Sequence, residues 1–105
     1  MTSVGLAPRR AALAVLRQVR DGHRFEPALD HALAGLRGAD RRLAHELAAG
    51  TFRARGALDA DLAPRAARGW TAVPSDLQDI LRLGAYQIQA LDRVPVHAAV
   101  GTSVA

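Results

Sequence analysis

The sequence predicts an all-α fold, and three observations support this prediction. Half of the 105 residues are apolar but only four are aromatic, so alanine, leucine and valine supply most of the apolar side chains. Alanine and leucine favour helices, whereas β-branched residues stay sparse until the last twelve positions. Apolar residues also recur at helical spacing between glycine and proline breaks. We therefore expect a bundle of about six helices around one core.

The first two predicted helices each begin at a proline, a residue favoured in a first turn. The first starts at Pro8 and ends before Gly22, because glycine commonly follows the last turn of a helix. Its expected buried stripe consists of Ala12, Val15, Leu16 and Val19. The second helix runs from Pro27 to about Leu36 and repeats the same apolar spacing.

The middle of the chain predicts two further helical segments. One starts near Asp40 and has Gly50 within its apolar pattern. A mid-helix glycine costs about 1 kcal/mol relative to alanine, so we expect either close helix–helix approach there or an early break. The next segment covers 58–67, and Pro64 should kink or interrupt it because proline lacks an amide hydrogen.

The best-defined predicted helix follows a Val-Pro break. Ser75 and Gln78 match the S-x-x-Q pattern of a capping box at its start. The apolar stripe that we expect it to bury contains Leu77, Ile80, Leu81, Gly84, Ile88 and Leu91. A last helix starts near Pro95 and is still running at Ala105, so we expect the domain to be incomplete at its C-terminus.

The sequence has no signature of catalysis, and we expect no catalytic, cofactor-binding or metal-binding residue in it. Without cysteine it lacks a thiolate nucleophile and a cysteine-ligated metal site. It has no glycine-rich phosphate loop, and its four histidines lack metal-ligand spacing. No run reaches the roughly 18 apolar residues of a membrane span, and the N-terminus does not read as a signal peptide. We therefore expect a cytoplasmic protein without a membrane partner.

Positive charge is the remaining feature, and all fourteen basic residues are arginine. The net charge of +4 favours an anionic partner, of which nucleic acid is the commonest. Three arginine pairs lie at or near predicted helix ends, where guanidinium groups can hold phosphate oxygens. The candidate RNA-binding residues are Arg9, Arg10, Arg41, Arg42, Arg53 and Arg55. The alternative is that these side chains are solvated or bridge to neighbouring carboxylates.

Several blocks of sequence resemble one known family. The first is DRRLAHEL from Asp40, followed by GTFR from Gly50 and then by Leu58-Asp59. The most specific blocks are LRLGAYQ within 81–87 and LDRVPVHAAV within 91–100. Together they resemble the NusB/RsmB superfamily, and within it the NusB-like domain of RsmB-type (Fmu or Sun type) 16S rRNA cytosine-C5 methyltransferases. The resemblance covers about residues 8–104.

The resemblance implies that residues 1–105 form a NusB-like RNA-binding domain, truncated before the catalytic domain. That absent domain would use S-adenosylmethionine to methylate small-subunit ribosomal RNA, and this chain would direct it to 16S rRNA. Arg9 and Arg10 are then the first candidates for RNA contact, and Arg82 and Tyr86 specify the fold. One alternative is a NusB-like transcription antitermination factor that binds leader RNA and a ribosomal-protein partner. Another is a structural interaction domain whose arginines are solvated.

Overall fold

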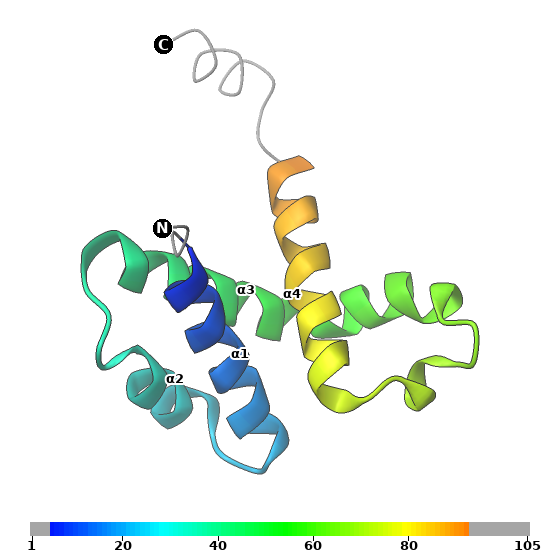
Figure 1. Cartoon of the computed structure of the whole chain (residues 1–105), viewed down its shortest axis with the longest axis horizontal. Coiled ribbons are helices and arrows are strands. Elements are labelled where there is room, and N and C mark those ends of the chain that lie inside the picture. Colours follow the sequence, from blue (N-terminus) through cyan, green and yellow to red (C-terminus); the bar gives the residue numbers. More distant parts are fainter. Residues whose placement is uncertain (1–4, 93–105) are drawn as a thin grey trace, which may run out of the picture.

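The computed structural model describes residues 5–92, and the regular structure in this range is entirely helical (Figure 1). It consists of α1 (Leu6–Arg20), α2 (Phe25–Leu33), α3 (Gly38–Leu62) and α4 (Ser75–Asp92), with two short 3-10 turns, Ala63–Arg65 and Trp70–Ala72, between α3 and α4. The predicted all-α fold is confirmed. The predicted last helix, from Pro95, lies outside the described residues.

Helix α1 has the predicted position and the predicted buried face. It begins at Leu6, two residues before the predicted start, and Gly22 follows its end with a φ of 104°. The amide of His23 donates to the carbonyl of Gln18 at 2.9 Å and closes the helix. In the predicted stripe, Ala12, Val15 and Leu16 are buried and Val19 packs against the core.

Helix α2 lies closer to the N-terminus than predicted. It begins at Phe25 rather than at Pro27, and it ends at Leu33 rather than near Leu36. Proline is tolerated throughout a first turn because the first amides of a helix have no intrahelical acceptor. Pro27 therefore marks the first turn of α2 without marking its first residue.

Helix α3 joins the third and fourth predicted segments into one helix of 25 residues. The predicted separation before Leu58 is wrong, and because Leu58 is fully buried, packing favours continuation of the helix at this point. The interruption predicted at Pro64 is confirmed, since the α-helix ends at Leu62 and a 3-10 turn containing Pro64 follows it. Residues 5–92 therefore contain four α-helices, fewer than the sequence predicts for this range.

At Gly50 the structure shows a close approach of α4 to α3, the first of the two outcomes that the sequence left open. A β-carbon on Gly50 would collide with the ring of Tyr86 from α4. The Tyr86 hydroxyl donates a hydrogen bond to the Glu46 carboxylate, one turn away on α3. The glycine thus removes the side chain that would separate the helices, and the fold-specifying role predicted for Tyr86 agrees with its buried position.

Helix α4 presents its predicted stripe to solvent instead of burying it. The large side chains of this stripe are exposed: Leu77 by 44%, Ile80 by 51%, Leu81 by 39% and Ile88 by 64%. The inner face instead consists of Asp79, Leu83 and Tyr86, which are buried. The predicted burial is therefore wrong for these four residues, because the described part of the chain covers only the opposite face. The side chain of Leu91 lies outside the described part.

The core lies where α1, α2 and α3 pack together, and the inner face of α4 closes one side of it (Figure 1). Phe25 of α2 stacks on Phe52 of α3 with ring centroids 4.5 Å apart. The start of α4 is tied to the preceding 3-10 turn, because the Gln78 side chain donates to the Trp70 carbonyl at 2.8 Å. In the predicted capping box the Gln78 side chain would contact the start of α4 at Ser75. In the structure α4 begins at Ser75 itself, and the Gln78 side chain contacts Trp70 in the preceding turn.

Candidate nucleic-acid interface

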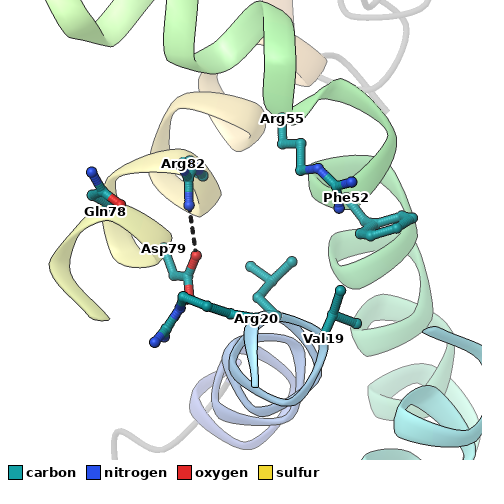
Figure 2. A pocket seen from close by; sticks show the side chains of 8 residues that line it. Val19, Arg20, Phe52, Arg55, Gln78, Asp79 and Arg82 are labelled. Atoms are coloured by element: carbon teal, nitrogen blue, oxygen red, sulfur yellow. Dashed lines mark hydrogen bonds and ion pairs between the residues drawn. The ribbon is translucent and has the colours of Figure 1, made fainter. Parts of the chain in front are cut away.

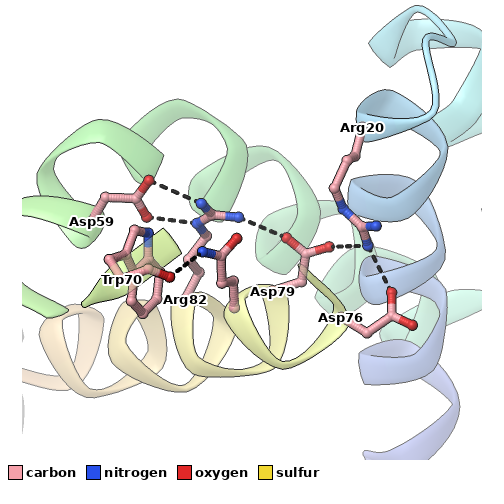
Figure 3. A network of polar contacts seen from close by, with 7 residues as sticks. Arg20, Asp59, Trp70, Asp76, Asp79 and Arg82 are labelled. Atoms are coloured by element: carbon pink, nitrogen blue, oxygen red, sulfur yellow. Dashed lines mark hydrogen bonds and ion pairs between the residues drawn. The ribbon is translucent and has the colours of Figure 1, made fainter. Parts of the chain in front are cut away.

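Two of the arginines are held by carboxylates in a chain of ion pairs that joins α1, α3 and α4 (Figure 3). Arg82 binds Asp59 of α3 through two hydrogen bonds of 2.6 and 2.9 Å. It also contacts Asp79 at 3.0 Å, and the second oxygen of Asp79 accepts a 2.9 Å hydrogen bond from Arg20 of α1. Arg20 reaches the exposed Asp76 as well, at 2.7 Å. This network links three helices.

The network commits both of its arginines to structural pairs. The hydrogen bond with Asp59 raises the pKa of Arg82, despite the opposing effect of burial. The hydrogen bond with Asp79, followed by that with Asp76, raises the pKa of Arg20. The hydrogen bond from Arg20 in turn lowers the pKa of Asp76. Arg82 therefore has the fold-specifying role that the sequence suggests. Because both arginines are paired with carboxylates, neither offers an unpaired positive charge to an RNA phosphate.

Arg9, a first candidate for RNA contact, makes structural contacts that the sequence did not indicate. Its guanidinium donates two hydrogen bonds, of 3.0 and 2.7 Å, to the side-chain oxygen of Gln87 on α4. It also donates to the carbonyl of Gly5 at 2.9 Å. Arg9 is therefore half-buried and joins the start of α1 to α4. An RNA contact by Arg9 stays a prediction.

Four exposed arginines lie at the start of α1 and around the start of α3, on segments next to the turn that follows α2. Arg10 and Leu36 line the same surface hollow, and Arg37 follows Leu36 directly. Arg41 donates a hydrogen bond to the carbonyl of Leu33, which holds its guanidinium beside the end of α2. We call this surface the basic end; it consists of Arg10, Arg37, Arg41 and Arg42. Among residues 5–92, no carboxylate lies within ion-pair distance of these four arginines.

The structure does not bring the third predicted pair, Arg53 and Arg55, into the basic end. Arg42 and Arg53 are eleven residues apart on α3, which places them about 20° apart around the helix axis and about 16 Å apart along it. Arg53 lies beside Gly50 and Tyr86. Arg55 points to another side of α3, where its guanidinium lies over the Phe52 ring, 4.1 Å from the centroid.

Sequence reasoning missed Arg37, the residue that precedes the first turn of α3. Unlike the six candidates, Arg37 has no second arginine within two positions of it. A usable signal was nevertheless present, because Arg37 and Arg41 are four residues apart and such positions lie on the same side of a helix. The position of Arg10 beside them is a tertiary feature and needs the packing of α1 against the end of α2.

Two other kinds of site are absent from the described part of the chain. Residues 5–92 contain no group of three or more histidine or acidic side chains placed to hold a metal ion. None of the helices in this range has the combined length and hydrophobicity of a membrane span.

The chain is similar to one protein family and to several longer proteins. Residues 6–105 match the model of the NusB family. The protein named "Putative methyltransferase Rv1407" in Mycobacterium tuberculosis is 47% identical over 100 residues, which cover 91% of this chain and 21% of that protein. The "Probable ribosomal RNA small subunit methyltransferase B" of Synechocystis is 37% identical over 103 residues, which cover 94% and 23% of the two chains.

A third relative has the same type of name. The "Ribosomal RNA small subunit methyltransferase B" of Pseudomonas putida is 35% identical over 98 residues, which cover 92% of this chain and 22% of that protein. The chain thus spans about one fifth of the length of these relatives. No solved structure matches it with significance.

Proposed function

The chain belongs to the NusB family, and from this membership we propose that it is the RNA-binding domain of a ribosomal RNA methyltransferase. On this proposal it directs the enzyme to small-subunit 16S rRNA in the cytoplasm, where the enzyme methylates C5 of a cytosine. The names of the matched relatives favour this over the antitermination alternative, because two of them are called ribosomal RNA small subunit methyltransferases.

The basic end is the observation that carries the proposal. Four arginines without carboxylate partners in the described range lie together on an exposed surface, and such a cluster attracts a phosphate backbone. Their guanidinium groups can each hold two phosphate oxygens. Asp40 lies among them in sequence and Glu46 lines one hollow with Arg41 and Arg42, and both carboxylates would oppose an anion, so the surface is not uniformly basic.

Methyl transfer itself is assigned to no residue of this chain. A methyltransferase of this kind uses S-adenosylmethionine as the methyl donor, and methylation of cytosine C5 needs a thiolate that adds to the neighbouring C6 and so makes C5 nucleophilic. Residues 5–92 form no strand–loop–helix unit that could hold this cofactor, and the chain has no cysteine. The residues present therefore do not fit the cofactor, and their proposed task is to bind RNA.

The test is filter binding of the 105-residue chain to a 16S rRNA fragment at several salt concentrations. We expect measurable binding at low salt that weakens linearly on a logarithmic scale as salt rises. The double variant Arg10→Glu with Arg42→Glu should bind at least tenfold more weakly. The matched control Arg24→Glu with Arg68→Glu makes the same change in net charge at exposed positions elsewhere, and it should lose no more than about threefold.

Two results would contradict the proposal. One is the absence of salt-dependent RNA binding by the unaltered chain. The other is an equal loss in the two double variants, which would mean that the basic end has no special part in binding. A pull-down against ribosomal proteins distinguishes the antitermination alternative, which requires such a partner.

A further inference from the structure

A hollow lies on the side of the molecule where Arg55 projects, between α1, α3 and α4 (Figure 2). Its volume is about 330 Å³, at the lower end of the range of small-molecule sites, about 300–1,000 Å³. Val19 and Arg20 come from α1, whereas Gln78 and Arg82 come from α4. No residue of the basic end lines it, so it is a separate feature of the surface.

One wall of the hollow is a stack of flat side chains. Phe25 stacks on Phe52 with an interplanar angle of 23°, and the Arg55 guanidinium lies over the same Phe52 ring. Arg55 is exposed and forms no ion pair with a carboxylate among residues 5–92. The stack therefore ends in a planar cation that borders the hollow, and proteins often stack RNA bases on guanidinium planes.

The remaining walls combine apolar and fixed polar groups. Leu16 and Val19 supply apolar surface. Across from them the Asp79 carboxylate bridges Arg20 and Arg82 and holds both guanidinium groups in place (Figure 2). Because Arg20 and Arg82 are paired with carboxylates, Arg55 is the one arginine lining the hollow that has no carboxylate partner among residues 5–92. A purely apolar ligand would in turn desolvate the charged groups without compensation.

A nucleobase is the ligand that satisfies both walls. It offers a flat face to the guanidinium of Arg55 and an edge of donors and acceptors to the polar groups, while its phosphate stays outside. We propose that the hollow bordered by Arg55, Val19 and Arg82 accepts one unpaired base of the bound RNA, stacked on the Arg55 guanidinium. This inference rests on the proposed RNA-binding function and adds a base-recognition site to it.

The test compares two charge-conserving variants of the full 105-residue chain. Arg55→Lys keeps the positive charge but removes the planar group, and Arg68→Lys makes the same change at an exposed position outside the hollow. The probes are a fluorescent octamer of riboadenylate and an abasic octamer with the same backbone. Fluorescence anisotropy gives their affinities, and thermal melting shows that each variant is folded.

We expect Arg55→Lys to bind the riboadenylate octamer at least fivefold more weakly, since base stacking contributes about 1–3 kcal/mol per base. Its affinity for the abasic octamer should change by less than twofold, and Arg68→Lys should change neither affinity by more than twofold. A second variant, Val19→Phe, narrows the hollow from α1 and should weaken binding of the base-containing probe alone.

The outcomes separate this inference from the proposed function. If the unaltered chain binds neither the octamers nor the 16S rRNA fragment, both fail. If RNA binding is present and depends on the basic end, but Arg55→Lys and Arg68→Lys behave alike, only the base site is overturned. An equal loss of Arg55→Lys affinity for both octamers also overturns it, because the contact is then to the backbone.

Discussion

Helices α1 and α4 both have an apolar stripe at helical spacing, yet only the stripe of α1 is buried in the described structure. The α1 stripe faces α3 and forms part of the core. The α4 stripe faces away from the core, and its most exposed member, Ile88, has 64% of its surface accessible. Periodicity therefore identified an apolar face in both helices, but it could not identify what covers that face.

The composition of the inner face of α4 explains why the apolar pattern predicted burial of the opposite face. It combines a carboxylate, Asp79, with Arg82 and the hydroxyl of Tyr86, which a hydrophobic pattern counts as polar. These groups are tolerated inside because each has a partner on α1 or α3. A helix face rich in paired polar groups can therefore form the inner side of a small domain.

The largest expected effect tests burial directly, with one truncation in the core and one on the outer face of α4. Leu33→Ala removes a fully buried α2 side chain and should lower the free energy of unfolding by about 2–5 kcal/mol. Ile88→Ala, on the outer face of α4, should change it by less than about 0.5 kcal/mol. Urea denaturation followed by circular dichroism measures both. A large loss in Ile88→Ala would show that the α4 stripe is covered in solution.

The next effect concerns the polar inner face of α4. Asp79→Asn removes the carboxylate that joins Arg20 to Arg82, and it should lower the free energy of unfolding by about 2 kcal/mol. Both arginines keep one other carboxylate partner, which limits the loss. Asp76→Asn removes an exposed partner of the same network and should cost clearly less. An equal loss of unfolding free energy in the two variants would mean that the burial of Asp79 does not strengthen its ion pairs.

A pair of glycines gives effects of opposite sign. Gly50→Ala forces the ring of Tyr86 to move, and alanine also has the better helix propensity, which partly offsets this cost. The net effect should be a destabilisation of about 1–2 kcal/mol. Gly84→Ala lies in the α4 stripe, where a β-carbon meets no atom within 4 Å, and should stabilise it by up to about 1 kcal/mol. Thermal melting distinguishes the two, and a destabilised Gly84→Ala would contradict an open outer face.

The smallest effect is a pH dependence at the exposed edge of the ion-pair network. Because Arg20 lowers the pKa of Asp76 below its ordinary value of 3.8, their pair stabilises the folded state above that pH. This contribution is lost as the pH falls and the folded carboxyl takes up a proton. Asp76→Asn should therefore melt slightly below the unaltered chain at pH 6, and the difference should shrink as the pH falls below 3.8. A difference independent of pH would exclude this origin.

Much of the fold could be predicted from sequence, because local signals set most helix positions. The end of α1 at Gly22, the interruption at Pro64 and the close approach at Gly50 all follow from properties of single residues. The continuity of α3 through Leu58 and the orientation of α4 depend instead on which surfaces meet. Such tertiary packing overrides local preference, and a single sequence does not contain it in readable form.

The candidate site was predictable in its chemistry but not in its grouping. Arginine pairs pointed to an anionic partner, and the structure shows Arg10, Arg41 and Arg42 exposed and without carboxylate partners in the described range. It also gives Arg9 a contact with Gln87, 78 residues away in sequence. Contacts of that separation depend on how α1 and α4 cross, and the spacing of arginines along the chain does not reveal them.

The unbroken course of α3 fixes the separation of two of its exposed arginines along the helix axis. Arg42 and Arg53 lie on one side of a continuous helix. Their positions are about 16 Å apart along the helix axis, and the helix is unbroken between them. If both bind the same RNA, the nucleic acid must adapt its backbone to this separation. One residue inserted between them would rotate one arginine by about 100° around the helix axis relative to the other. The helix could still form, but the two arginines would no longer lie on the same side of it.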